Sequence, residues 1–324
     1  MVSCYNFTFD SMLDPKNDQL AERGIEIHAI SSASKPLSSW AMRDAIQECR
    51  EACGGHGYLK ASGLGDLRNN NDANCTYEGD NTVLLQQTSN WLLKFWPSIL
   101  KRSKISTPLK SADFLTNAEL ILKNTLRATD VNQFCSSSNM IDTYQWLVSY
   151  LLRESYENLK NTLRNGSDPF WANSNNQVFL AKDLSIAYIQ HFILQQMLVT
   201  INEASDENVR NVLQRLFSLY AVWSLKEHHL TTLYRGGFFN GYLPSKLIQD
   251  AILKLCTELK DDAVALIDAI APPDFAIASV LGYSDGEIYK RLESIVMHSP
   301  YGMGRPTWWQ ELVENDGCIS KSKL

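Results

Sequence analysis

Apolar residues recur at three- and four-residue steps along most of this chain, and that period restricts it to helical folds. One such stripe lies within residues 141–163, a second within 209–223, and a third starts behind Pro244 and ends at Leu259. Strand-like alternation is scarce. The 324 residues are 44% hydrophobic, enough for one large core or two moderate ones. The sequence therefore predicts an all-α protein.

Composition divides the predicted helices into two domains. It loosens between Pro97 and Asp113, which places a boundary near residue 106. We expect one helical domain over residues 1–105, a second over 106–319, and a short tail over 320–324. The Gly- and Asn-rich segment 54–81 and the polar segment 165–176 interrupt the periodicity, so both are predicted to be loops.

Charge and apolar patterning exclude several classes of function. A net charge of -6 argues against a nucleic-acid partner, which needs a concentrated basic face. The basic cluster Lys101, Arg102 and Lys104 is interpreted as a solvated linker. The apolar run 184–201 contains Gln and His residues that are costly in hydrocarbon, so a buried helix is predicted and no membrane span. The His228–His229 pair lacks carboxylates at metal-ligand spacing, so we expect surface or packing roles and no metal site.

Residues 40–93 carry the features that point to chemistry. A predicted helix ends in Gly54-Gly55-His56-Gly57, where backbone N–H groups are exposed with no Cβ in the way. Such a turn can lie against a pyrophosphate or another flat anionic ligand. A plain helix C-cap explains the same glycines, and the pattern alone leaves both interpretations open.

Glu78 is equally ambiguous. It lies between Tyr77 and Gly79, just before the apolar run 83–85. A glutamate there can simply neutralise a helix N-terminus. Alternatively, it is a general base on a strained turn beside an apolar wall.

The combination of these motifs resembles the acyl-CoA oxidases, peroxisomal relatives of the acyl-CoA dehydrogenases. Cys-Gly-Gly-His-Gly-Tyr at 53–58, a loop containing Arg68, and Thr-Tyr-Glu-Gly-Asp-Asn-Thr at 76–82 carry the likeness. The segments 19–28 and 34–40 look most like the branched-chain (pristanoyl-type) subgroup. Pro-Pro-Asp-Phe at 272–275 and Asp-Gly-Glu-Ile-Tyr at 285–289 are similar to the family's C-terminal helical domain. The resemblance covers residues 18–324.

The resemblance implies FAD as cofactor and a fatty acyl-CoA as substrate. Glu78 would take the α-proton while the β-hydrogen leaves as hydride, giving a trans-2-enoyl-CoA, and O2 would be reduced to H2O2. This is the first step of peroxisomal fatty-acid β-oxidation. Tyr77 and Gly79 would lie at the substrate, and His56 would be structural or supporting. The positions assigned to flavin contacts, some to the other subunit's flavin, are Gln47, Gly54, Gly55, Gly57, Asp80, Asn81 and Thr82.

The last three residues are Ser322, Lys323 and Leu324, a tripeptide that acts at a C-terminus as a peroxisomal address read by an import receptor. This tail agrees with the resemblance and predicts a peroxisomal location. Family precedent further implies a homodimer that shares flavin contacts.

The sequence departs from the family at its N-terminal side. The family's chains are much longer, and their N-terminal helical domain and middle β-domain have no counterpart here. Residues 1–9 do not match a family start, so we expect a fragment, a splice form or an incomplete gene model, with its base facing solvent.

Two other functions stay open. One is a non-catalytic helical module that dimerises with full-length oxidase or binds acyl-CoA. The other is a dehydrogenase that passes electrons to a protein acceptor, although the tail and the long C-terminal domain count against it.

Overall fold

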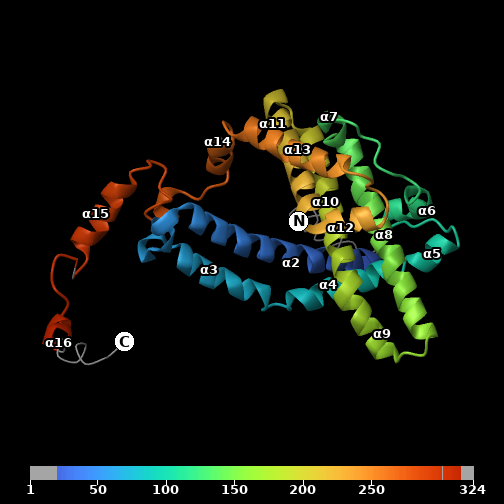
Figure 1. Ribbon diagram of the computed structural model, residues 1–324, viewed down its shortest axis with the longest axis horizontal. Helices are drawn as coiled ribbons and strands as arrows, with labels where there is room; N and C mark the ends of the chain where they lie inside the picture. The colour runs from blue at the N-terminus through green and yellow to red at the C-terminus, as the bar shows by residue number, and fades with distance from the viewer. Residues whose placement is uncertain (1–19, 301, 315–324) are drawn as a thin grey trace. The chain divides into compact units, whose positions relative to one another are not determined.

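The computed structural model describes residues 20–300 and 302–314, whose regular elements are all helices, with no strand among them (Figure 1). The prediction of an all-α fold is confirmed. Within the described residues the chain forms two compact units. The large unit contains the described residues up to Ala41 together with Asn74–Ala269, and the small unit contains Met42–Ala73 and the described residues from Ile270 onward.

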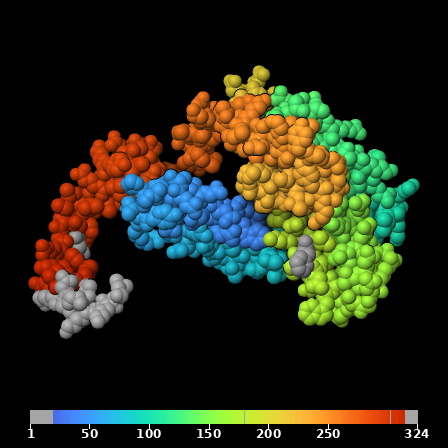
Figure 2. Space-filling view, in the orientation of Figure 1, coloured from blue at the N-terminus to red at the C-terminus, as the bar shows by residue number. Residues whose placement is uncertain are grey.

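The core of the large unit is built around α10 (Lys182–Glu203). This helix packs against α8 (Ser137–Arg164), α4 (Asn81–Leu93) and α11 (Glu207–Ser224), and α11 packs in turn against α13 (Leu243–Leu259). The stripes that predicted α8 and α13 are largely buried, whereas the stripe of α11 is buried at Phe217 and exposed at Val209 and Trp223. Burying each large apolar side chain stabilises the fold by about 1.5–3 kcal/mol. In space-filling view the green-to-orange segments form one continuous packed body (Figure 2).

The remaining elements are shorter, apart from the long helix α2 (Leu20–Ala52), which contributes to both units. The large unit also contains α5 (Trp96–Leu100), η4 (Asp113–Asn117), α6 (Ala118–Ile121), α7 (Val131–Phe134), α9 (Pro169–Asn176), η5 (Gln177–Ala181), η6 (Leu225–His229), α12 (Leu230–Arg235) and α14 (Ala263–Asp268). The small unit contains η1 (Gly54–Tyr58), η2 (Lys60–Ser62), α3 (Leu64–Asp72), η7 (Asp274–Ala276), α15 (Ile288–His298) and α16 (Trp309–Glu314), while η3 (Ala73–Cys75) lies where the units join in sequence.

Both segments predicted to be loops contain helices, so that expectation is wrong. Within 165–176, α9 begins after Asp168, whose carboxylate accepts hydrogen bonds from Phe170 N (2.9 Å) and Trp171 N (3.4 Å). Pro169 occupies the first helical turn, where its missing N–H costs nothing. Within 54–81, α3 begins after Gly63, which has a left-handed φ of 70°. Because both helices are polar, the apolar periodicity did not indicate that helices begin after Asp168 and Gly63.

The segment around residue 106 is anchored to the large unit. Glu26 of α2 is 1% exposed, and its carboxylate accepts hydrogen bonds from Leu109 N (2.7 Å), Ser111 N (3.1 Å) and Ser111 Oγ. The Tyr188 hydroxyl of α10 donates to Ser111 Oγ (2.6 Å). A buried carboxylate that accepts several hydrogen bonds satisfies the backbone of a segment outside regular structure. The domain boundary predicted near residue 106 thus lies inside the large unit and stays a prediction, while Lys101, Arg102 and Lys104 are exposed, as predicted.

Among the described residues, α10 is the one helix long and apolar enough to cross a membrane, judged by length and composition. Its apolar window has a mean hydropathy of 1.3, and 61% of that window is buried inside the protein. Of the four polar residues that argued against a span, Gln190 and His191 are buried in the core, Gln195 is half-buried and Gln196 is exposed. This placement agrees with the predicted buried helix.

Two buried histidines lie in this core. His191 packs against Phe114 with ring centroids 4.5 Å apart, and neither ring nitrogen has a hydrogen-bond partner among the described residues. Burial lowers the pKa of His191 to about 3. His229 Nε2 lies 2.7 Å from Gln190 Oε1, and burial, with a smaller contribution from His228, lowers the pKa of His229 to about 3. His228 is exposed, so the pair has the packing and surface roles predicted for it.

The small unit folds back on the last turns of α2 through η1. A Cβ on Gly57 would lie 2.0 Å from the Arg50 carbonyl oxygen, so only glycine allows this approach. The Gly57 carbonyl accepts a hydrogen bond from Ser62 Oγ (3.1 Å), and Val280 N donates to Ala61 O (3.1 Å), which ties the C-terminal segment to η2. A Cβ on Gly55, by contrast, would meet nothing within 4 Å.

The buried histidines predict acid destabilisation. An unfolded histidine has a pKa of about 6.5, so below that pH the unfolded chain binds protons that buried His191 excludes. The free energy of unfolding should fall as the pH drops from about 6.5 toward about 3. His191→Phe should reduce the loss between pH 7 and pH 5 by about 2 kcal/mol, measured by urea denaturation followed by tryptophan fluorescence. The exposed His28→Gln control should leave the loss unchanged; an unaltered loss in His191→Phe would contradict the assignment.

Alanine substitutions at two glycines of η1 test whether Gly57 is required for close packing and Gly55 is not. Gly57→Ala forces a methyl group into the Arg50 carbonyl and should destabilise the small unit by about 2 kcal/mol or more. Gly55→Ala is the matched control and should change stability by less than about 0.5 kcal/mol. Hydrogen exchange of the small-unit amides reports both values. Equal protection in the two variants would show that the close approach at Gly57 does not exist.

Candidate functional site

The turn between η3 and α4 holds Glu78 in an uncommon backbone conformation. Glu78 has a φ of 55° and Gly79 a φ of 102°, both in the left-handed region. For a residue with a Cβ, that conformation costs about 1–2 kcal/mol. The Glu78 side chain is exposed. The structure thus shows a strained turn, as the general-base interpretation requires.

Asp80 caps the helix that follows Glu78. Its Oδ1 accepts hydrogen bonds from Thr82 N (2.9 Å) and Val83 N (3.3 Å), which satisfies the first N–H groups of α4. Across residues 20–300 and 302–314, no hydrogen bond or ion pair engages the Glu78 carboxylate. Capping of α4 therefore falls to Asp80, and the Glu78 carboxylate remains available for other chemistry.

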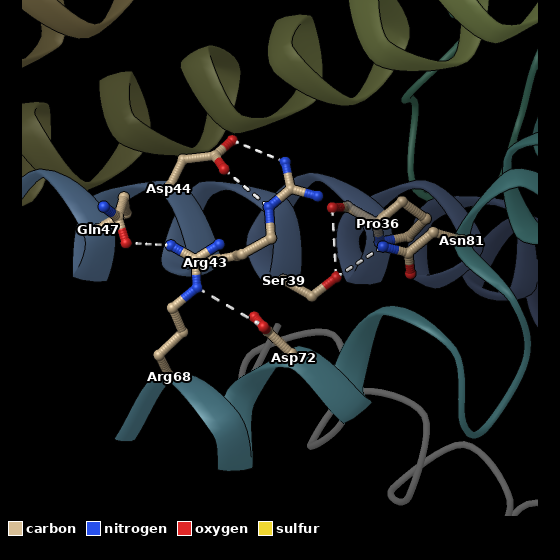
Figure 3. A network of polar contacts seen from close by, with 8 residues as sticks. All are labelled: Pro36, Ser39, Arg43, Asp44, Gln47, Arg68, Asp72 and Asn81. Carbon is tan, nitrogen blue, oxygen red and sulfur yellow. Dashed lines mark hydrogen bonds and ion pairs between the residues drawn. The ribbon is translucent and has the colours of Figure 1, made fainter. Parts of the chain in front are cut away.

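The Glu78 turn is attached to α2 by Lys35 and Ser39. Lys35 Nζ donates to the Gly79 carbonyl oxygen (2.6 Å) and to Asn81 Oδ1 (2.9 Å). Asn81 is 2% exposed, and its Nδ2 donates to Ser39 Oγ (2.9 Å), a contact drawn in Figure 3. These bonds join one face of α2 to the residues directly after Glu78.

Gln47 takes part in a polar network on the small unit. Its Nε2 donates to Glu51 Oε1 (2.6 Å), and its Oε1 accepts from Arg68 Nη1. Within α3, Arg68 Nε also lies 3.6 Å from Asp72 Oδ2 (Figure 3). The bond between Arg68 and Gln47 links α3 to α2. The Arg68 seen in the sequence motif therefore belongs to a helix, where it orients Gln47.

The glycines at the end of α2 divide between structural and open positions. Gly54 has a φ of 56° directly after the last turn of α2, which is the conformation of a helix C-cap glycine. Gly57 is required for the approach to Arg50. Gly55 has neither constraint and is exposed. The C-cap interpretation thus accounts for Gly54, and Gly55 is the position whose bare backbone can be approached from outside.

The predicted cofactor and substrate residues differ in what they can offer a ligand. Thr82 and Asp80 are exposed at the start of α4, and the Tyr77 ring is 53% exposed with its hydroxyl donating to Asn74 Oδ1. The Asn81 amide is engaged at both ends, so it holds the turn in place.

Sequence reasoning missed Lys35 and Ser39 as site residues. Both lie in the segment 34–40 that carries the family resemblance, but Lys35 is separated from Asn81 by 46 residues in the chain. No local pattern signals a contact over that distance. The structure brings Gly79, Asn81 and Thr82 together with Glu78 in the large unit, and Gln47 and the 54–57 glycines belong to the small unit.

Ser322, Lys323 and Leu324 lie outside the described residues, which contain no group of three or more His, Cys, Asp or Glu side chains able to hold a metal.

Two protein-family models match the chain. Residues 136–316 match the model described as acyl-CoA oxidase, and residues 1–93 match the acyl-CoA oxidase C-alpha1 domain. The predicted boundary near residue 106 falls between the two matched regions.

Relatives and solved structures agree with these matches. The chain is 46% identical over 308 residues to human peroxisomal acyl-coenzyme A oxidase 3, covering 94% of this chain and 44% of the relative. It is 34% identical to Caenorhabditis elegans acyl-coenzyme A oxidase acox-3, again covering 94% of this chain and 44% of the relative. The fold superposes on Arabidopsis thaliana acyl-CoA oxidase 1 with a TM-score of 0.87 at 23% identity, over 97% of this chain and 47% of that one.

This chain spans less than half the length of the relatives it matches. Within that span the resemblance predicted from the motifs at 53–58 and 76–82 is confirmed, since one family model alone covers residues 136–316. The chain belongs to the acyl-CoA oxidase family.

Proposed function

We propose that this chain supplies the catalytic base for the FAD-dependent oxidation of a fatty acyl-CoA to a trans-2-enoyl-CoA, with O2 reduced to H2O2. The observation that carries the proposal is the exposed Glu78 carboxylate on a left-handed turn, without a partner among the described residues. A carboxylate held this way by its backbone, while a neighbour caps the helix, is suited to proton transfer.

The chemistry requires such a base to be positioned and assisted. The α-proton of a thioester is weakly acidic, so the developing enolate oxygen needs hydrogen-bond donors, each worth a few kcal/mol. In our proposal the Glu78 carboxylate accepts the α-proton and the Glu78 backbone N–H donates to the thioester oxygen. Gly79 has no side chain that would cover this face of the turn, and the exposed Tyr77 ring flanks the acyl group.

The proposed flavin contacts on this chain fall into two sets of residues. Gly55, with Gly54, Gly57 and Gln47 around it, would face the diphosphate or adenosine portion, and Asp80, Asn81 and Thr82 would lie near the adenine end. When bound, FAD would accept the β-hydrogen as hydride and pass the electrons to O2. A related enzyme, Caenorhabditis elegans acyl-CoA oxidase-1, was solved in complex with FAD and ATP. The open backbone at Gly55 supports this placement.

Activity requires more than the span present here. Because the chain covers 44% of its relatives, the remaining flavin and acyl-chain contacts would come from the rest of such an enzyme. We also propose a peroxisomal location, since relatives are named peroxisomal and the Ser322-Lys323-Leu324 tail is an address for an import receptor. Finally, we propose that two copies of the enzyme form a homodimer whose subunits share flavin contacts.

A chimera tests the role of Glu78. In it, this chain replaces the matched 308-residue region of human peroxisomal acyl-coenzyme A oxidase 3. The chimera should release peroxide on addition of an acyl-CoA, and Glu78→Gln should lower the rate by about 1,000-fold or more, because the amide cannot accept the α-proton. Exchange of the substrate α-proton with deuterated water should be lost in parallel.

The control for that experiment is Glu207→Gln, an exposed glutamate on α11 whose replacement should leave turnover unchanged. Substantial turnover in Glu78→Gln would remove Glu78 from the mechanism. If the chimera binds flavin yet is inactive, and the chain co-purifies with full-length oxidase, the non-catalytic module is the better description.

Electron-acceptor dependence separates an oxidase from a dehydrogenase. In air, the chimera should form one peroxide per enoyl-CoA, and an artificial electron acceptor should not be required. A chimera that turns over only when the artificial acceptor is added would indicate a dehydrogenase and contradict the oxygen-linked half of the proposal. Both products are measured in the same reaction, peroxide by a coupled assay and enoyl-CoA by absorbance.

A further inference from the structure

The turn that carries Glu78 is held to α2 by a chain of polar contacts that is buried at Asn81 and Ser39 and exposed at Gly79. Lys35, Asn81 and Ser39 form a continuous chain of hydrogen bonds from α2 to the Gly79 carbonyl. The three bonds measure 2.6, 2.9 and 2.9 Å, and the shortest is the bond from the charged ammonium group to the Gly79 carbonyl. Asn81 is 2% exposed and Ser39 is 8% exposed, so water competes poorly for the bond between them.

This chain of contacts acts directly on the residues next to the proposed base. Gly79 follows Glu78 in the chain, and both have left-handed φ values of 102° and 55°. Such a turn relaxes toward common backbone conformations unless the surrounding structure holds it. The ammonium group of Lys35 bonds to the Gly79 carbonyl and to Asn81, the first residue of α4. It therefore fixes the Gly79–Asp80 peptide unit, one residue beyond Glu78.

We propose that Lys35 is a positioning residue for the Glu78 base, acting through the Gly79 carbonyl and the Asn81–Ser39 pair. The proposal deepens the proposed function and rests on it. Lys35 is not assigned contact with substrate or flavin. Its role is to keep Glu78 and its backbone N–H in one conformation, which matters because small displacements of a catalytic group cost large factors in rate.

A backbone measurement on the chain itself tests the positioning without any need for activity. Lys35→Met keeps most of the side-chain length and removes the donor. Hydrogen exchange of the Thr82, Val83 and Leu84 amides, which are bonded to Asp80, should become about tenfold faster or more, while the amides of α10 stay protected. Lys94→Met, an exposed lysine just after α4, is the matched control and should change neither region.

The catalytic arm uses the chimera described above. Lys35→Met should lower kcat by about 10- to 100-fold with KM nearly unchanged, and Lys35→Arg, which restores a cationic donor, should recover part of kcat. Ser39→Ala removes only the last link and should produce a smaller change in the same direction, which also covers the case in which Lys35→Met misfolds.

Unchanged exchange at residues 82–84 in both Lys35→Met and Ser39→Ala would overturn the proposal, as would a loss confined to KM. Faster exchange together with full activity in the Glu78→Gln chimera would instead preserve the tie to the turn and reject Glu78 as the base. The two failures are therefore distinguishable.

Discussion

A single ammonium group joins two helices at the residue that follows the proposed base. Lys35 projects from the middle of α2 and bonds to the Gly79 carbonyl and to Asn81 at the start of α4. Without such a tie, two consecutive left-handed residues would be an unfavourable choice for a surface turn. The large hydrophobic core behind it, centred on α10, supplies the rigidity against which this turn is held. Ser185 of α10 reinforces the arrangement by donating to the Leu85 carbonyl of α4 (2.7 Å).

The carboxylates near the turn have separate tasks because their surroundings differ. Asp80 caps α4 through two backbone N–H groups, and Glu26 is buried, where it organises the segment around Ser111. Glu78 is exposed and has no such structural duty within the described chain. Because Asp80 caps α4, protonation of Glu78 during the proposed reaction would not remove the helix cap.

Much of the fold was predictable because each long amphipathic stripe in the sequence indicates one helix with one buried face. The stripe from Ile141 to Leu163 predicted α8, and the Gln and His residues within 184–201 correctly indicated a core helix. The helices α3 and α9 were missed because their sequences are polar, and their start signals at Gly63 and Asp168 are single residues. The sequence predicted two domains that meet near residue 106, but it did not predict units built from separate segments of the chain, since these depend on contacts between residues such as Ala61 and Val280 that are far apart in the chain.

The site was predictable only as far as local motifs reach. The motif at 76–82 located Glu78, yet its left-handed φ and its unengaged carboxylate required the structure. The glycine motif at 54–57 did not distinguish the C-cap at Gly54, the close approach at Gly57 and the open position at Gly55, because three glycines look alike in sequence. Lys35 gave no signal, as its partners lie 44 and 46 residues away.

The most direct measurement is a crystal structure of the human chimera with FAD and an unreactive acyl-CoA analogue. Our account places a Glu78 carboxylate oxygen within about 3.5 Å of the analogue's α-carbon, with the left-handed turn at Glu78 retained. A structure in which the Glu78 carboxylate points into solvent while another acidic side chain lies at the α-carbon would contradict the account.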